Sequence, residues 1–462
     1  MPLKINVILK YGLMVIAALA GLWLLGDHIF FSVDPLRPFY QHEIIIALFI
    51  FVVFFGALIF YLVKFNNFKP NYVAIIGLAV VFVILFIRLL VISPQTFNIT
   101  APGGDSYTFE SHLTSLERLK YCAQAFVTFT LAYFFIDVFP KAVKYNEFKY
   151  VLYFMLSIIY VLIICSYFVD FKNYINLITF KGGDINGYGI KSIFPHKTVY
   201  GYIVMIGGFI ALQLYAKERK WYWLANVGII AIHLLFTLSK LAIIVFFVAA
   251  AAYLIYLFVI TYKEDPKKHK IILFSCLGAI LLLLVIFVVL FIASATIREK
   301  VNDLMKPSGY NTFTTRVWIW NYAFAILKQT SVFLGAGMFY FASVLRQANL
   351  MDPETAIVNN TSQTHNAYIS MLSNGGVPLL TLYVLLIAFV IFVLVKQFKK
   401  DIKVSLFYAL VLAGLLVYGI FEAAPIMLAT SAEHMLGGAF AVSGLLLHAR
   451  QNNEQVHISN SN

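Results

Sequence analysis

Charged residues are scarce in this chain of 462 residues. Asp, Glu, Lys and Arg together make up 12% of the sequence, whereas 61% of the residues are hydrophobic and the mean hydropathy is +0.86. A soluble globular domain is about half apolar and about a quarter charged. The composition therefore excludes an ordinary soluble protein and predicts an all-α polytopic membrane protein.

Cysteine is equally scarce, with three residues in the whole chain. Cys122, Cys165 and Cys276 stand apart inside apolar segments and lack the CxxC spacing of a metal or redox motif. Isolated cysteines of this kind are typical of packing positions in a hydrophobic core. The thiols therefore exclude a disulfide framework and a cysteine metal site.

Motifs for nucleotides and catalytic metals are missing as well. The chain has no P-loop, no GxGxxG after a strand, no HExxH and no DxD pair that would hold a metal for a nucleotide-sugar donor. We therefore expect no metal and no cofactor. A reaction outside the cytoplasm, where ATP is absent, would need a donor substrate that is already activated.

Apolar runs long enough to cross a bilayer, about 20 residues each, recur along the chain. We predict twelve spans, at 8–25, 42–63, 72–94, 117–140, 150–169, 198–216, 221–238, 241–262, 271–293, 377–395, 404–422 and 433–449. The first run has no small-residue cleavage site behind it, which predicts a retained membrane anchor.

Lys and Arg cluster in the short loops between these spans. With the N-terminus placed inside, the short basic loops KFNNFK, KAVKYNEFK, KERK, KEDPKKHK and KQFKKDIK all fall on the same side. Because cytoplasmic loops carry an excess of Lys and Arg, this asymmetry predicts that both termini are cytoplasmic. The net charge of +13 thus reflects membrane topology, and we expect no nucleic acid partner.

Three predicted outer segments are longer than simple connections: 95–116, 170–197 and 294–376. The predicted organisation is a bundle of nine spans at 1–293, a large extracytoplasmic loop at 294–376, and three further spans with a cytoplasmic tail at 377–462. Long structured loops are usually functional.

The large loop contains TTRVWIWNYAFAILKQ, which predicts an amphipathic helix with Thr314 as its N-cap. At the end of the loop, Gly375 and Gly376 are expected to allow a tight turn into the tenth span.

Unusual polar residues gather at the outer ends of the predicted spans. They are His196, Lys197, Lys240, Arg316, His365 and Asn366. Each has an ordinary alternative, since lysines commonly extend from helix ends to the interface and a loop histidine can bond to backbone. Their shared side favours an anionic head group carried by a lipid. Arg88, inside the third span, is either functional or paired with a carboxylate.

Four segments carry a family resemblance. FPHKTVYGY, LSKLAIIVF, TRVWIWNYAFAIL followed by LGAGMFYF, and HNAYISMLSNGGVPLL occur in the order and spacing of the bacterial O-antigen ligase and polysaccharide polymerase superfamily, which they resemble. The resemblance extends over about 194–380. It implies a GT-C-like membrane glycosyltransferase that uses an undecaprenyl-diphosphate-linked glycan without metal or ATP. The implied acceptor is a glycan, lipid A–core or a wall polymer, and membrane lipids surround the protein.

The resemblance also implies roles for single residues. His365 corresponds to the family's essential loop histidine, the base, and Arg316 to an arginine that binds the diphosphate. Lys240 stands where an arginine is usual, which keeps the charge but loses the bidentate fork. His196, Lys197 and Asn366 complete the donor-binding set, with HKT at the position of the family's HKN.

The chemistry of such a transfer fits these residue types. Fixed cations stabilise the charge that builds on the leaving diphosphate, and a histidine can take the proton of the acceptor hydroxyl. Attack opposite the leaving group predicts inversion at the anomeric carbon. Polymerase and ligase both remain open, with HKT favouring a polymerase slightly. The alternative of another class is a non-catalytic flippase or transporter for lipid-linked oligosaccharides, which should line a central cavity with its cations.

Overall fold

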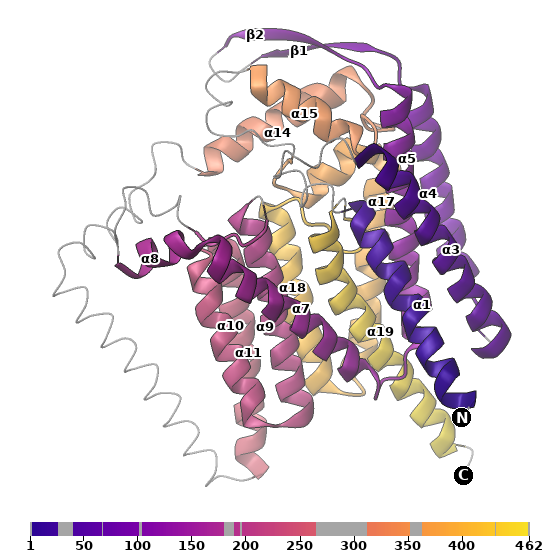
Figure 1. Ribbon diagram of the computed structural model, residues 1–462, viewed down its shortest axis with the longest axis vertical. Coiled ribbons are helices and arrows are strands. Elements are labelled where there is room, and N and C mark those ends of the chain that lie inside the picture. Colours follow the sequence, from indigo (N-terminus) through magenta and orange to yellow (C-terminus); the bar gives the residue numbers. More distant parts are fainter. Residues whose placement is uncertain are drawn as a thin grey trace. The chain divides into compact units, whose positions relative to one another are not determined.

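The computed structural model describes residues 2–25, 40–66, 68–100, 104–179, 189–194, 196–264, 312–351, 363–429 and 431–460. Helices dominate these residues, together with a two-stranded sheet (Figure 1). The chain forms two compact units. Unit 1 consists of Met1–Lys149, Phe313–Tyr408 and Leu415–Asn462, and unit 2 of Tyr150–Thr312 and Ala409–Gly414.

Unit 1 contains most of the helices and both strands. Its described elements are α1 (Pro2–Leu25), α3 (Tyr40–Asn66), α4 (Tyr72–Val91), β1 (Gln95–Thr100), β2 (Ser106–Ser111), α5 (Ser115–Tyr133), η2 (Phe134–Val138), α6 (Phe139–Ala142), α14 (Thr312–Gln329), α15 (Tyr340–Met351), α17 (Ala367–Phe398), most of α18 (Ile402–Phe421) and α19 (Ala432–Asn460).

Unit 2 is a smaller helical bundle. Its described helices are α7 (Phe148–Val169), α8 (Phe171–Thr179), α9 (Lys197–Glu218), α10 (Trp221–Phe236) and α11 (Lys240–Glu264). Helix α9 lies at its centre, and every residue from Tyr200 to Leu214 is buried. Glycines allow this close packing, because a Cβ at Gly207 would lie 2.9 Å from the side chain of Ile159 in α7.

Eight helices in the described part of the chain are long and apolar enough to cross a membrane. Shorter apolar helices cover Leu9–Leu22 and Trp221–Phe236, within two further predicted spans. The predicted all-α polytopic membrane protein is thereby confirmed. The predicted span at 271–293 lies outside the described residues, and the one at 433–449 lies in α19 (Ala432–Asn460), which is not among these helices. The total of twelve therefore stays a prediction.

Two helices begin earlier than their sequences suggest. Helix α14 starts at Thr312, so Thr314 lies within the helix and is not its N-cap. Helix α17 starts at Ala367, although the apolar run starts only at residue 377. The first turns of α17 mix apolar residues with the buried Ser370, Ser373 and Asn374, so tertiary contacts stabilise a helical segment that no continuous apolar run marks.

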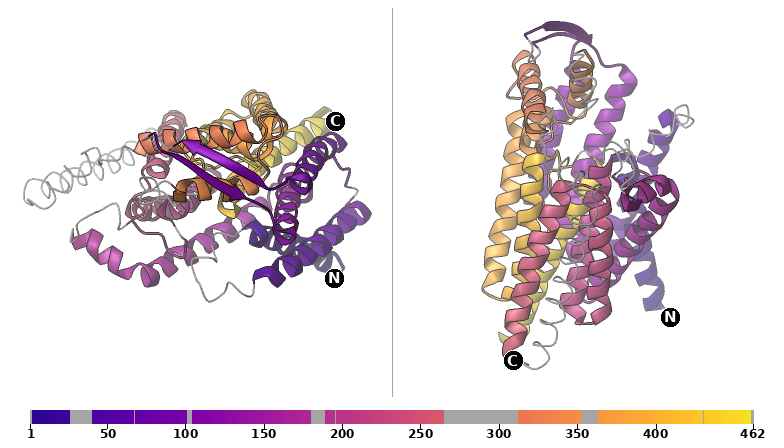
Figure 2. Two further views of the ribbon diagram at one scale, coloured as in Figure 1. Left: turned by 90° about the horizontal axis from the view of Figure 1, so that it is seen from above. Right: turned by 90° about the vertical axis from the view of Figure 1, so that its left-hand side faces the viewer.

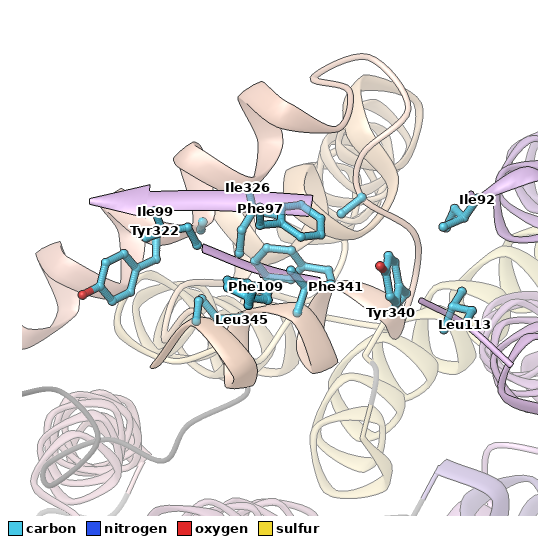
Figure 3. Close-up of a cluster of buried hydrophobic side chains, with 14 of the residues drawn as sticks. Ile92, Phe97, Ile99, Phe109, Leu113, Tyr322, Ile326, Tyr340, Phe341 and Leu345 are labelled. Carbon is cyan, nitrogen blue, oxygen red and sulfur yellow. The ribbon is translucent and has the colours of Figure 1, made fainter. Parts of the chain in front are cut away.

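The outer segment after α4 forms an antiparallel hairpin of β1 and β2 (Figure 2). Phe97 pairs with Phe109, and their rings stack at 5.4 Å. Alternation along the strands turns these rings toward α14 and α15, where they join a buried core with Tyr322, Ile326 and Phe341 (Figure 3). The hairpin thus covers the two helices that follow one another in the predicted large loop.

Candidate functional site

Two predicted site residues of unit 1 meet at one carboxylate. Arg316 Nη2, in the first half of α14, donates to Glu422 Oε1 at 3.0 Å. His365 Nδ1, just before α17, lies 2.8 Å from Glu422 Oε2. Glu422 follows the last residue of α18. Three segments far apart in sequence therefore form a charged cluster, which we call the Glu422 cluster.

The backbone around His365 fixes where its ring points. His365 has φ of 48°, a left-handed conformation that is uncommon outside glycine. Asn366 then caps α17 by accepting from Ile369 N at 2.9 Å, and its Nδ2 donates to Ile420 O at 2.9 Å. The predicted donor-binding residue Asn366 is thus a helix cap that ties α17 to the end of α18.

A second set of bonds ties the same segment to α14. Trp320 Nε1, one turn after Arg316, donates to Thr364 O at 2.8 Å. The hydroxyl of Thr364 donates to Asn366 O at 2.8 Å. The strained residue His365 is therefore bracketed by two residues whose positions are fixed by hydrogen bonds.

Glu422 is the most buried member of the cluster, with 6% of its surface exposed. Burial by itself raises the pKa of this carboxyl, but the contact with His365 and the positive charge of Arg316 lower it by more, so the pKa lies below its usual value. Glu422 is consequently an anion at neutral pH. A buried anion of this kind is stable only because it is paired.

The ionised carboxylate also determines how His365 carries its proton. A carboxylate only accepts hydrogen bonds, so the Nδ1 atom that contacts it must be the protonated nitrogen. In the neutral ring the lone pair then resides on Nε2.

Sequence reasoning missed Glu422. The search considered paired acidic motifs and histidines, whereas Glu422 is a single acid at the last position of the predicted span 404–422. An acid at the end of an apolar run is costly unless it has a partner. That cost was a usable signal, but the identity of the partners depends on contacts between distant segments.

The other predicted residues, His196, Lys197 and Lys240, belong to unit 2. His196 is the N-cap of α9, where its Nδ1 accepts from Thr198 N at 3.3 Å. Lys197 is the first residue of α9, and the exposed Lys240 is the first residue of α11. All three therefore lie at helix starts.

The starts of α9 and α11 pack directly against each other. A Cβ at Gly201 would lie 2.8 Å from Ser239 Oγ, and one at Gly189 would lie 2.5 Å from both Lys197 Cδ and Thr237 O. Ser239 is buried, and its hydroxyl has no hydrogen-bond partner among the described residues. Two positive helix ends and two lysines thus occupy one end of unit 2, an arrangement suited to an anion.

In the described part of the chain, no group of three or more His, Cys, Asp or Glu side chains is arranged to hold a metal ion.

The fold and the cluster define a polytopic membrane protein that combines a histidine, a carboxylate and an arginine at the ends of its helices. Residues 225–384 match the family model described as O-antigen ligase, and this segment belongs to that family. The resemblance predicted from the motifs is confirmed, and Lys240, Arg316 and His365 lie inside the matched segment. A search among curated proteins finds no match.

The apolar helices and the match over residues 225–384 together support a bacterial membrane protein of the O-antigen ligase or polymerase type.

Proposed function

We propose that the protein is an inverting glycosyltransferase that transfers or polymerises a glycan carried on undecaprenyl diphosphate, at the outer face of the cytoplasmic membrane. The observation that supports this proposal best is the Glu422 cluster. It holds a cation and a base on the two oxygens of one buried carboxylate, at 3.0 and 2.8 Å.

Arg316 is the proposed diphosphate clamp. Its planar guanidinium can bind two phosphate oxygens at once, and its charge stabilises the leaving group as the bond to the anomeric carbon breaks. The family resemblance assigns donor-binding roles to Lys197, Lys240, His196 and Asn366 as well. No metal is required, because these fixed cations offset the developing charge.

His365 is the proposed general base. Its Nε2 takes the proton of the acceptor hydroxyl while the hydroxyl oxygen attacks the anomeric carbon opposite the diphosphate, and undecaprenyl diphosphate departs. The resulting imidazolium is stabilised by Glu422 on Nδ1. The family resemblance and the fixed tautomer both support this assignment.

The proposed orientation places both termini in the cytoplasm and the β1–β2 hairpin outside. It rests on the basic short loops. Single cysteines at Thr108, in β2, and at Lys400, between α17 and α18, test it with a reagent that does not cross membranes. If Lys400→Cys but not Thr108→Cys were labelled in intact spheroplasts, the orientation would be the opposite of the proposed one.

A reconstituted assay tests the function itself. Purified protein in liposomes is supplied with an undecaprenyl-diphosphate-linked glycan, an acceptor and a chelator, and the product is analysed by mass spectrometry. Formation of an inverted glycosidic bond supports the proposal. Translocation of the donor without bond formation would identify a flippase instead.

The acceptor distinguishes the two activities of the family. In a deletion strain, loss of long glycan chains alone indicates a polymerase that extends one lipid-linked glycan with another. Accumulation of long chains on the lipid carrier indicates a ligase that transfers the finished glycan to lipid A–core, a wall polymer or another acceptor.

A further inference from the structure

Helix α17 is interrupted ten residues after Asn366, within unit 1. Gly376 has φ of 64° and ψ of −156°, and Pro378 follows it inside the helix. Proline has no N–H and cannot bond to the preceding turn. Backbone groups at the interruption therefore need partners from elsewhere, because buried peptide groups are rarely left unpaired.

The turn after α14 supplies these partners. Val377 N donates to Phe333 O at 3.0 Å, and Ala336 N donates to Ser373 O at 2.8 Å. Asn374 Oδ1 accepts from Phe339 N at 3.0 Å. Residues 333–339 thus fill the interruption from the side, and we call this contact the α14–α17 junction.

The junction is backbone against backbone, which explains its glycines. A Cβ at Gly335, where φ is 71°, would lie 2.6 Å from Gly376 N and 2.8 Å from Gly375 N. A Cβ at Gly376 would overlap Phe333 O. No side chain fits at either position, so the backbones at Gly335 and Gly376 are held at a fixed distance from each other.

Arg88 holds this turn from α4. Its Nε donates to Gly335 O at 3.3 Å, and its Nη2 is buried with no hydrogen-bond partner in the described residues. Leu85 lies under Gly375, and Ile92 lies under Gly337. Leu85, Arg88 and Ile92 are three and four residues apart, so one face of α4 and the residue that follows it pack against the junction.

The junction and the Glu422 cluster are connected through the same two helical segments. Helix α14 carries Arg316 near its start and leads into the turn at its end, while the first part of α17 runs from the cap after His365 to the interruption. The bond from Trp320 to Thr364 joins these segments at the other end. Fixing both ends fixes the position of Arg316 relative to His365.

We propose that Arg88 is a positioning residue for glycan transfer: by holding the Gly335 turn in the interruption of α17, it sets the spacing of Arg316 and His365. This inference rests on the proposed function, and Arg88 itself does not touch substrate. A displacement of about 1 Å at a reacting group can cost roughly 100-fold in rate. Loss of Arg88 should therefore lower kcat and leave the KM for the donor nearly unchanged.

The test compares Arg88→Met with Arg88→Lys, which keeps a donor for Gly335 O, and with Ile87→Ala as the matched control on the exposed face of α4. In the reconstituted assay we expect Arg88→Met to lose about 10- to 100-fold in kcat, with partial rescue by Arg88→Lys. Asn374→Ala removes the hydrogen bond from Phe339 N and should also lower kcat without changing the KM. This variant tests the same junction if Arg88→Met does not fold.

A distance measurement is independent of activity. In a full-length protein whose three cysteines are replaced by alanine, spin labels at Lys328 in α14 and Leu372 in α17 should give a narrow distance distribution. Arg88→Met should broaden it, whereas Ile87→Ala should not. Unchanged kcat in Arg88→Met, or lost kcat with an unchanged distribution, would overturn the inference. An absence of turnover in the unsubstituted protein would instead reject the proposed function and leave the distance test valid.

Discussion

The two groups of predicted site residues are held in different ways. In unit 1, Arg316 and His365 bind the two oxygens of a buried carboxylate, so each side chain has a fixed direction. In unit 2, the exposed Lys240 projects from a helix start that is fixed by backbone packing against Gly201. We therefore predict that side-chain geometry matters in the Glu422 cluster, whereas positive charge alone matters at the helix starts of unit 2.

Among the variants of these residues, His365→Ala should reduce turnover most. A positioned general base contributes roughly 100- to 10,000-fold in rate, so turnover in the reconstituted assay should fall by that factor while donor binding is retained. His112→Ala, at an exposed histidine after β2, is the control. Normal turnover by His365→Ala would remove the histidine from the mechanism.

Arg316 tests whether geometry or charge matters in the cluster. Arg316→Ala should abolish detectable transfer, since one fixed charge at the leaving group is worth roughly 100- to 1,000-fold. Arg316→Lys should recover little, because a lysine offers a point charge in place of a planar fork. Initial rates over a range of donor concentrations measure both variants. Full activity of Arg316→Lys would erase the predicted difference between the two units.

Glu422→Gln should have an intermediate effect. The amide keeps the shape but loses the charge that orients His365 and Arg316. Hydrogen bonds to charged groups contribute about 1.5–3 kcal/mol, which corresponds to roughly 10- to 100-fold in kcat. Glu110→Gln on the exposed edge of β2 is the matched control, and both are compared at saturating donor. Equal kcat values for the two variants would show that the cluster needs no carboxylate.

The lowered pKa of Glu422 adds a dependence of stability on pH. A carboxyl whose pKa is lower in the folded state stabilises the protein above its unfolded pKa, about 4.3 for glutamate. That contribution is lost as the pH falls through the lower folded value. Glu422→Gln should therefore unfold at a lower temperature than the parent at pH 7, and the gap should close below about pH 4. Thermal unfolding in detergent at several pH values measures this; a gap that widens in acid contradicts the assigned pairing.

Much of the fold follows from local sequence. Long apolar runs specify the membrane helices regardless of their partners, and the order of the motifs was sufficient to select Arg316 and His365. The hairpin carried a usable signal too, since apolar and polar residues alternate through QTFNIT and SYTFES. Interpreting 95–116 only as an outer segment overlooked that period of two.

Other features depend on contacts that no local pattern records. The first turns of α17 contain buried polar residues that interrupt the apolar pattern, and the interruption at Gly376 is stabilised by the Gly335 turn that fills it. Glu422 is recognised as part of a cluster only through its contacts with Arg316 and His365, which lie 106 and 57 residues away in sequence. For Arg88 the sequence leaves a functional role or a carboxylate partner open, and only the structure shows that its Nε donates to the backbone carbonyl of Gly335.

Substitution of Lys240, in unit 2, should change the kinetics of transfer least. It is the first residue of α11 and is exposed, and its surroundings are fixed by the packing of Ser239 against Gly201. Lys240→Arg keeps the charge and should be tolerated. Lys240→Ala removes one charge of several near the helix starts, and an exposed ion pair is worth about 0.2–1 kcal/mol. The expected change is therefore at most about 5-fold, seen in the KM for the donor and growing at low ionic strength.

Gly201→Ala is the informative partner, because it displaces Ser239 while leaving every charge in place. If Lys240→Ala proved as severe as Arg316→Ala, or if Lys240→Arg were inactive, the lysine would need defined geometry, and the predicted difference between Lys240 and the Glu422 cluster would disappear.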